Sequence, residues 1–169
     1  MSSLSKFWPI MAAIALLGIA FYFYYSPKTV QNPPPPPQAP AFTQDGSLTF
    51  WQKASGDSLA SIAIEIADTE EKMELGLMFR QTMEERQGML FIYQDEGLRN
   101  FWMKSTQIPL DIIYVNAQQQ IVTIQKNTVP YSESPVPSTA PAQYVVEVNA
   151  GFSDRFQLKE GDLITFERG

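Results

Sequence analysis

The chain has 169 residues, with 12 basic and 18 acidic side chains and a formal net charge of −6. It contains no Cys and no His, which excludes Cys/His zinc sites, Ser-His-Asp triads, thiol nucleophiles and disulfides. The acidic balance and the lack of a basic stripe argue against a nucleic-acid partner.

The N-terminal residues 1–28 are predicted to form a transmembrane anchor. No charged residue occurs from Phe7 to Tyr25, and a helix of that length covers roughly 28 Å, close to the thickness of a bilayer core. Aromatic residues cluster at both ends of this run, as in interfacial belts. We therefore expect a membrane-anchored protein whose C-terminal domain is extracytoplasmic, either periplasmic or at the cell surface. The alternative is a signal peptide cleaved near Ala20 and a secreted product.

Residues 29–43 are rich in proline and are predicted to be a linker. The run Pro33–Pro37 favours polyproline II, which is extended and stiff at about 3.1 Å per residue. A spacer that holds a domain away from a membrane is the first interpretation. The alternative is a ligand for an SH3-like module.

Residues 44–169 are predicted to be one globular domain built mainly from short strands. Thr69 and the following acids are typical of a helix start, and Gly76 ends that helix. Val129–Pro141 carries four prolines and is expected to be a loop. The predicted strands are Ser47–Gln52, Ser58–Ala67, Gly88–Gln94, Arg99–Lys104, Leu110–Asn116, Gln120–Gln125, Gln143–Val148 and Leu163–Glu167.

This pattern predicts a mainly β (α+β) fold: a compact, curled or barrel-like antiparallel sheet with one or two short helices, preceded by the N-terminal membrane helix. A curled sheet would hide the strand edges that otherwise promote aggregation.

The segment FWMKSTQIPLDIIY, residues 101–114, concentrates polar and aromatic side chains at a corner between two strands. In a strand, Trp102 and Lys104 share one face, while Phe101 and Met103 share the other. Asp111 lies among apolar residues and so needs a partner, which could be Lys104, Thr106 or backbone amides. The segment is then either a structural corner held by a Lys104–Asp111 pair or a ligand site.

Two further charged residues are candidates for a ligand site. Arg80 follows an apolar triplet and could clamp a carboxylate, either an internal one such as Glu74 or Glu85 or one on a ligand. Glu147 shares a strand face with Val145 and could point to solvent. Alternatively, Glu147 converges with Asp111, and the two carboxylates could then act as general acid and base or bind a hard cation.

Six sequence blocks in order resemble the family catalogued as domain of unknown function 192, over roughly Ser61–Phe166. They are Glu65–Thr69, Gly76–Arg80, Gly88–Phe91, Phe101–Lys104, Ile108–Ile112 and Val146–Gly151. The resemblance implies a small β-rich domain, often behind a signal or anchor and a variable linker, and it implies no activity. The family usually has Asn where this chain has Ser105. The replacement of Asn by Ser would change ligand binding if the Asn contacts a ligand. It would have little effect if the Asn only caps the turn.

The function expected from the sequence is a binding or interaction module with a polar ligand, such as a glycan, at the corner. The candidate ligand-binding residues are Arg80, Trp102, Lys104, Thr106, Asp111 and Glu147. One alternative is a carboxylate-dependent, glycosidase-like hydrolase that uses Asp111 and Glu147. Another is a structural envelope domain whose partner contacts lie in Val129–Pro141. We assign no catalytic residue, cofactor or metal, and we leave enzymatic activity open while leaning against it.

Overall fold

The computed structural model describes residues 21, 22, 24, 25 and 39–169. The chain divides into two compact units, Met1–Pro36 and Pro37–Gly169. Most of the predicted anchor, and the predicted linker up to residue 38, lie outside the described residues. Within the described part, no helix is both long and apolar enough to cross a membrane.

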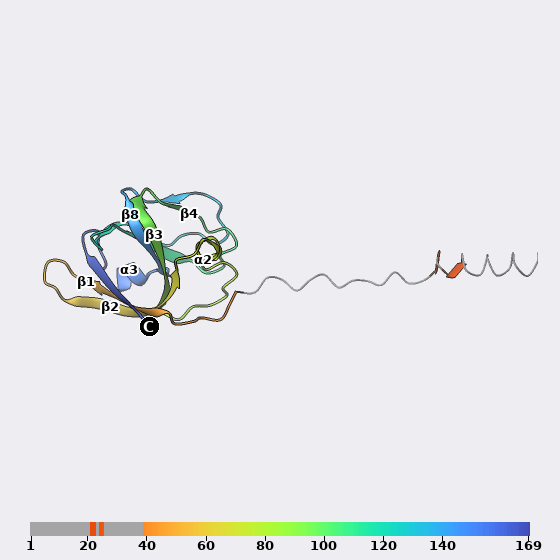
Figure 1. Cartoon of the computed structure of the whole chain (residues 1–169), viewed down its shortest axis with the longest axis horizontal. Helices are drawn as coiled ribbons and strands as arrows, with labels where there is room; N and C mark the ends of the chain where they lie inside the picture. The colour runs from red at the N-terminus through yellow and green to blue at the C-terminus, as the bar shows by residue number, and fades with distance from the viewer. Residues whose placement is uncertain (1–20, 23, 26–38) are drawn as a thin grey trace, which may run out of the picture. The chain divides into compact units, whose positions relative to one another are not determined.

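The second unit is mainly β, with two short helices (Figure 1). Its elements are β1 (Gly46–Trp51), β2 (Ser58–Ala67), α2 (Glu70–Leu75), β3 (Gln87–Gly97), β4 (Asn100–Phe101), β5 (Leu110–Val115), β6 (Ile121–Gln125), β7 (Val136–Pro137), β8 (Ala142–Asn149), α3 (Phe152–Arg155) and β9 (Leu163–Arg168).

Seven strands form one sheet in the order β6-β5-β8-β3-β2-β1-β9, and β4 pairs with β7 separately. The prediction of a mainly β fold with short helices is confirmed, but the prediction that its strands pair only antiparallel is wrong. β2 and β3 pair in parallel, because α2 and the segment after it carry the chain back between them. The sheet is curled rather than closed: its two edges meet where Gln120, just before β6, forms a bridge with Leu163 at the start of β9.

The predicted strand Arg99–Lys104 is much shorter in the structure. Only Asn100 and Phe101 pair, with Pro137 and Val136 of β7. Beyond them the chain turns, with the amide of Thr106 donating to the carbonyl of Met103 at 3.0 Å. The corner residues therefore lie in a loop, where side chains do not alternate regularly between two faces as they do along a strand.

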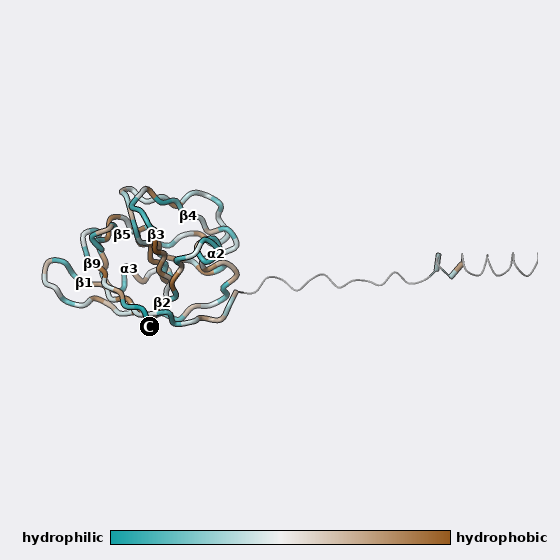
Figure 2. The backbone as a smooth tube through the Cα atoms, in the orientation of Figure 1, coloured by the Kyte–Doolittle hydropathy of each residue, from teal (hydrophilic) through white to brown (hydrophobic). Residues whose placement is uncertain are grey.

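Both faces of the central strands are buried. One core, with Leu90, Ile113 and Val146 at its centre, is covered by α3 through Phe152. The other core contains Phe91, Tyr114 and their neighbours and lies on the opposite face. All six residues of β5 are buried, and Figure 2 shows continuous hydrophobic stretches along the central strands. Each fully buried large apolar side chain of this kind contributes about 1.5–3 kcal/mol.

The helix predicted after Thr69 is confirmed. The Thr69 hydroxyl accepts a hydrogen bond from the Lys72 amide at 3.3 Å, and Glu70 and Glu71 occupy the first turn, where the helix dipole favours acids. Gly76 ends the helix with a φ of 48°, a conformation that costs glycine least. The turn brings Leu77 into the second core.

Candidate functional site

Three loop segments meet at the corner that the sequence singled out. The amide of Phe79 donates to the carbonyl of Ser105 at 2.8 Å, and the amide of Tyr131 donates to the carbonyl of Thr106 at 3.1 Å. The amide of Met103 donates to the carbonyl of Ser132 at 2.9 Å. Main-chain bonds between segments far apart in sequence thus hold the loops around residues 79, 105 and 131 as one layer.

Each of these three loops contains a non-glycine residue with a left-handed backbone. The φ angles are 63° at Phe79, 56° at Ser105 and 60° at Tyr131. Such conformations cost side chains free energy, persist only where the surroundings enforce them, and cluster at functional sites. Asn tolerates the left-handed region better than Ser does, so the Asn that the sequence resemblance implies at position 105 would suit this backbone conformation.

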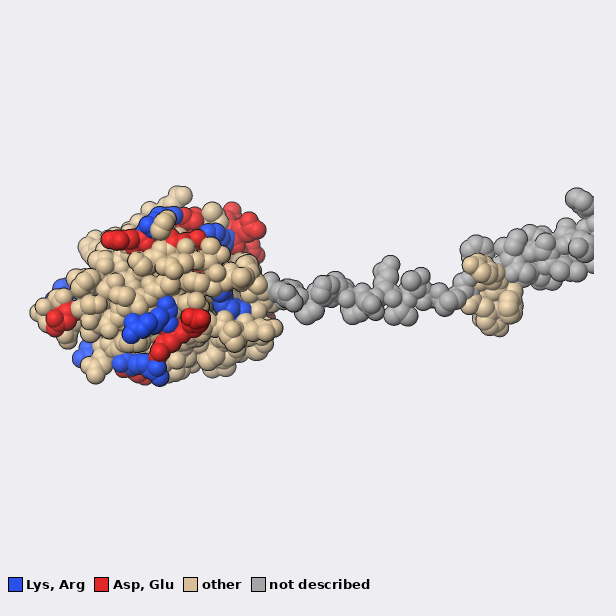
Figure 3. All heavy atoms as spheres, turned by 90° about the horizontal axis from the view of Figure 1, so that it is seen from below, with Lys and Arg blue, Asp and Glu red and all other residues tan. Residues whose placement is uncertain are grey.

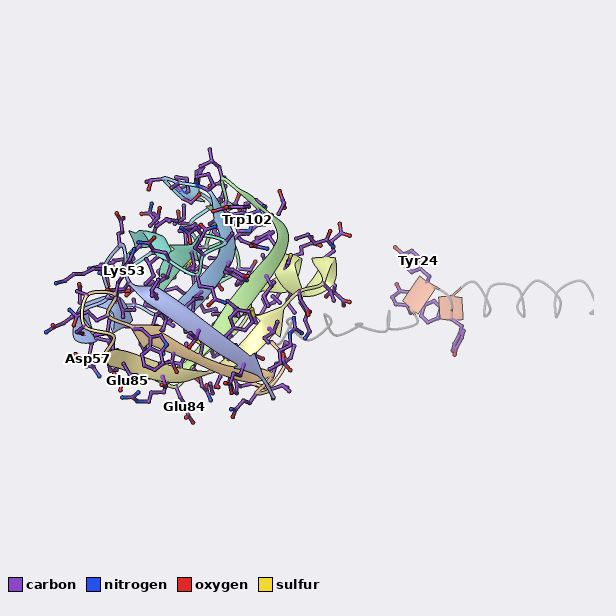
Figure 4. The ribbon with its side chains drawn as sticks, turned by 60° about the vertical axis from the view of Figure 1, so that its left-hand side comes forward. Tyr24, Lys53, Asp57, Glu84, Glu85 and Trp102 are labelled. Atoms are coloured by element: carbon purple, nitrogen blue, oxygen red, sulfur yellow. The ribbon has the colours of Figure 1, made fainter. Side chains whose placement is uncertain are left out.

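The loop layer presents four exposed side chains, which we call the corner surface: Trp102, Lys104, Val129 and Tyr131. Trp102 is 51% exposed and Tyr131 is 62% exposed. The ammonium of Lys104 lies 5.5 Å from the centre of the Trp102 ring, a cation–π distance. Figure 4 labels Trp102 near the top of the domain, well away from Glu84 and Glu85 at the bottom.

Beneath the corner surface, Thr106 and Met103 belong to the supporting structure. Met103 is fully buried and Thr106 is 5% exposed. The Thr128 hydroxyl donates to the carbonyl of Leu110 at 2.9 Å and lies 3.1 Å from the sulfur of Met103. Of the two sets of side chains that the sequence analysis placed on opposite faces, Phe101 and Met103 pack inward, and Trp102 lines an open surface.

Asp111 is fully buried and is satisfied entirely by backbone amides. Its Oδ1 accepts from the amides of Asn127 at 2.9 Å and Gly151 at 3.2 Å, and its Oδ2 accepts from that of Ser153 at 2.9 Å. Lys104 is exposed and makes no ion pair with it. The predicted Lys104–Asp111 pair is wrong: Asp111 joins the β6–β7 connection to the start of α3.

Arg80 is buried and pairs with Glu65, a partner that the sequence reading did not consider. Its Nη2 lies 2.6 Å from Glu65 Oε2, and both side chains are about nine-tenths buried. Glu85, one of the partners suggested from sequence, pairs with Arg155 instead. The Nε of Arg80 is buried without a hydrogen-bond partner in the described part of the chain.

Glu147 lies in the second core, 5% exposed, and its Oε2 has no hydrogen-bond partner within the described residues. Burial raises the pKa of Glu147 to about 8, because the charged form loses its hydration there. Gly76 lies close to the Glu147 carboxyl group. A methyl group added to Gly76 would lie 3.9 Å from Glu147 Oε2 and 3.3 Å from the Phe91 ring. The pKa of Tyr93 is raised, mainly by burial and to a smaller extent by the nearby charge of Glu147, although Arg99 opposes this shift.

Asp111 and Glu147 point to opposite faces of the sheet. Asp111 lies across from Val148, while Glu147 lies across from Ile112. Cross-strand partners share a face and successive residues alternate, so Asp111 belongs to the face of the first core and Glu147 to that of the second. The convergence of these two carboxylates, on which the hydrolase hypothesis depended, is wrong.

A family model describes residues 51–166 of the chain: DUF192, an “Uncharacterized ACR”. The chain belongs to the DUF192 family. A crystal structure of a protein of unknown function from Novosphingobium aromaticivorans is similar to it, with 31% identity and a TM-score of 0.69, covering 82% of this chain and 98% of that one. A “putative transcription regulator” from Sinorhizobium meliloti matches with 32% identity and a TM-score of 0.68, covering 72% and 92%. No curated protein matches.

The DUF192 blocks recognised in the sequence come together in space. Gly76, Phe91 and Glu147 belong to three different blocks and meet in the second core. The Phe101 ring packs edge-on against Phe91, with 5.0 Å between the ring centres. Motif residues of this chain therefore build a buried cluster around the Glu147 carboxyl group, while Asp68, Thr69, Trp102, Lys104 and Pro109 of the six blocks are exposed.

The six candidate residues thus fall into separate environments. Trp102 and Lys104 form part of an open surface, Thr106 supports it, and the other three are buried in different places. Sequence reasoning missed Tyr131 and Glu65. Tyr131 lies in the predicted loop Val129–Pro141 and was not considered by itself. Glu65 lies in strand β2, whose sequence pattern was interpreted from its isoleucines alone. Among the described residues, no cluster of three or more acids could hold a metal ion.

Proposed function

We propose that this DUF192 protein is a membrane-anchored binding module whose domain is displayed outside the cytoplasm. The uncharged run from Phe7 to Tyr25 and the proline-rich stretch behind it support this arrangement. The alternative is release after cleavage near Ala20. If the anchor is retained, the chain stays in the membrane pellet after alkaline carbonate extraction. Full recovery in the supernatant would contradict anchoring.

The ligand class that fits the corner surface best is a neutral glycan. The observation that carries this proposal is the half-exposed Trp102, flanked by Lys104 and fixed on the hydrogen-bonded loop layer. A rigid aromatic face offers stacking area at low entropic cost, and Lys104 and the Tyr131 hydroxyl can donate hydrogen bonds to sugar oxygens. Main-chain hydrogen bonds of Met103 and Tyr131 to Ser132 and Thr106 tie these groups to the loop layer.

The charge of the domain supports a neutral ligand rather than a polyanion. Outside residues 1–28 the chain has ten basic and 18 acidic side chains. On the face seen in Figure 3 the two signs are interspersed and form no basic stripe. This distribution does not fit DNA binding, which requires a concentrated positive surface.

The glycan proposal is tested by tryptophan fluorescence with a soluble tetrasaccharide of N-acetylglucosamine. We expect a saturable change in the wild-type chain, and affinity reduced about tenfold or more in Trp102→Ala because the stacking face is lost. Trp51→Phe is the matched control: Trp51 bonds Thr165 on the β1–β9 side of the domain, so that variant keeps the response.

No saturable change at millimolar sugar would contradict the glycan proposal. An equal change in Trp102→Ala would show that the sugar binds elsewhere. Unfolding midpoints measured on the same samples separate loss of binding from loss of folding.

A further inference from the structure

A cavity of about 610 Å³ lies between the start of the domain and the segment that follows α2. One wall consists of residues 39–42 and the other of residues 79–84, with Gln87 beside them. Glu84, which Figure 4 shows far from Trp102, is part of this lining, and so is Phe79 of the loop layer. The corner-surface residues Trp102, Lys104, Val129 and Tyr131 do not line the cavity.

Arg80 places an unused hydrogen-bond donor just behind the surface of this cavity. The side chain lines the cavity, yet the residue is only 7% exposed. One end of its guanidinium is held by Glu65 at 2.6 Å, while Nε has no partner in the described part of the chain. A buried donor left without an acceptor costs about 1–3 kcal/mol, so an acceptor that displaces the atoms covering Nε would recover that cost.

The two walls also leave main-chain groups free. Within residues 39–169, no main-chain hydrogen bond is made by Ala41, Gln81 or Thr82. Phe42 adds an aromatic face, with the Arg80 guanidinium 6.0 Å from its ring centre. An extended chain could lie between these walls and contact both of them.

The charge of the cavity selects against an anionic occupant. Arg80 is already neutralised by Glu65, and Glu84 adds a negative charge to the lining. An uncharged segment rich in carbonyl oxygens matches the free donor without bringing in a second carboxylate.

We propose that this cavity binds the proline-rich segment Pro33–Pro37 of a second copy of the chain. Five consecutive prolines carry no amide N–H and no charge, so they present carbonyl acceptors and ring surfaces only. Aromatic-lined grooves recognise such segments because little conformational entropy is lost on binding. Arg80 Nε donates to a proline carbonyl, and the Phe42 ring packs on a pyrrolidine.

The segment in the cavity comes from another copy because of chain length. Only Gln38 separates Pro37 from the wall residue Ala39. One residue spans about 3.5 Å, which is too short for the preceding prolines to turn back between the walls that residues 39–42 help to form. A neighbouring copy has no such restriction.

The test measures fluorescence anisotropy of a labelled peptide, QNPPPPPQAP (residues 31–40), added to the full chain in detergent micelles. We expect saturable binding, and no binding of the same peptide with alanine in place of its five central prolines. Arg80→Lys keeps a positive charge beside Glu65 but removes Nε–H, and is expected to weaken binding about tenfold. Phe42→Ala leaves the ion pair intact and is expected to weaken it as well. Trp51→Phe, on the β1–β9 side of the domain, is expected to bind like wild type.

Several results would overturn the proposal. These are the absence of saturable binding at millimolar peptide, equal binding of the alanine peptide, and unchanged affinity in both Arg80→Lys and Phe42→Ala. Sedimentation then tests the second-copy assignment: the wild-type chain is expected to self-associate more strongly than a chain with alanine at positions 33 to 37. If the peptide binds but the wild-type and alanine-substituted chains self-associate equally, the cavity would be assigned to another proline-rich protein. That result would overturn the assignment to a second copy of this chain.

Discussion

At pH 8 the Glu147→Gln variant is expected to be more stable than the wild-type chain by about 4 kcal/mol, whereas at pH 5 the two should agree within about 1 kcal/mol. The Glu147 carboxyl is buried in the second core, and burial raises its pKa from 4.5 to about 8. Glutamine has the same shape and cannot ionise, so the variant removes the ionisation of this side chain and little else.

The direction follows from proton binding in the two states. Between pH 4.5 and about 8 the folded state keeps the proton on Glu147 while the unfolded state releases it. The wild-type chain therefore loses stability as pH rises through this window, by about 1.4 kcal/mol per pH unit, and levels off above it. Tyr93 and Tyr114 lie near the carboxyl, and burial raises the pKa of each further above the window, so both stay neutral.

Urea unfolding at pH 5, 6, 7 and 8 measures this difference, since other titrating groups contribute equally to both chains. Glu133→Gln is the matched control: Glu133 is exposed, so its removal should leave the pH dependence unchanged. A wild-type minus variant difference that is constant from pH 5 to 8 would mean that Glu147 is already ionised at pH 5, which contradicts its isolation in the core.

Asp111→Asn is expected to destabilise the chain by about 2–4 kcal/mol at pH 7. The carboxylate accepts three backbone amides from two separate segments, and bonds to a charged acceptor contribute about 1.5–3 kcal/mol each. The asparagine side chain has one acceptor oxygen, so its NH₂ group must face at least one amide donor in a fully buried place. The amides that would lose their acceptor include those of Gly151 and Ser153, where α3 begins.

Lys104→Met provides the control for this measurement. Lys104 is exposed and unpaired with Asp111, so thermal and urea unfolding of that variant should stay within about 0.5 kcal/mol of wild type. Equal losses of stability in both variants would indicate that Lys104 and Asp111 form an ion pair, which would contradict the structure. Unchanged stability in Asp111→Asn would mean that water, rather than the protein, satisfies these amides.

Much of the fold was open to prediction because it depends on local signals. Strand β2 was predicted at its observed bounds, since alternating isoleucines report a half-buried strand. The cap at Thr69 and the stop at Gly76 follow from side-chain and backbone preferences that act within one helical turn. The β5–β6 hairpin joins neighbours in sequence, and the DUF192 blocks could be recognised as a set.

The site was less predictable because it depends on register and on contacts across the chain. A shift of one residue between β5 and β8 would have placed Asp111 and Glu147 on the same face, and no feature of either strand alone reports the register. The partner of Arg80 is 15 residues away along the chain and was missed, because Glu65 reaches it only once β2 and the loop after α2 are packed.

The sequence by itself determined the class of the domain, its family, the acidic charge and most strand positions, since these depend on composition and short-range periodicity. The tertiary structure alone decided the parallel pairing of β2 and β3, the opposite directions of Asp111 and Glu147, and the joining of Trp102, Lys104 and Tyr131 in one surface. Those features arise from hydrogen bonds and packing between segments far apart in the chain, where residue order places no direct constraint on distance.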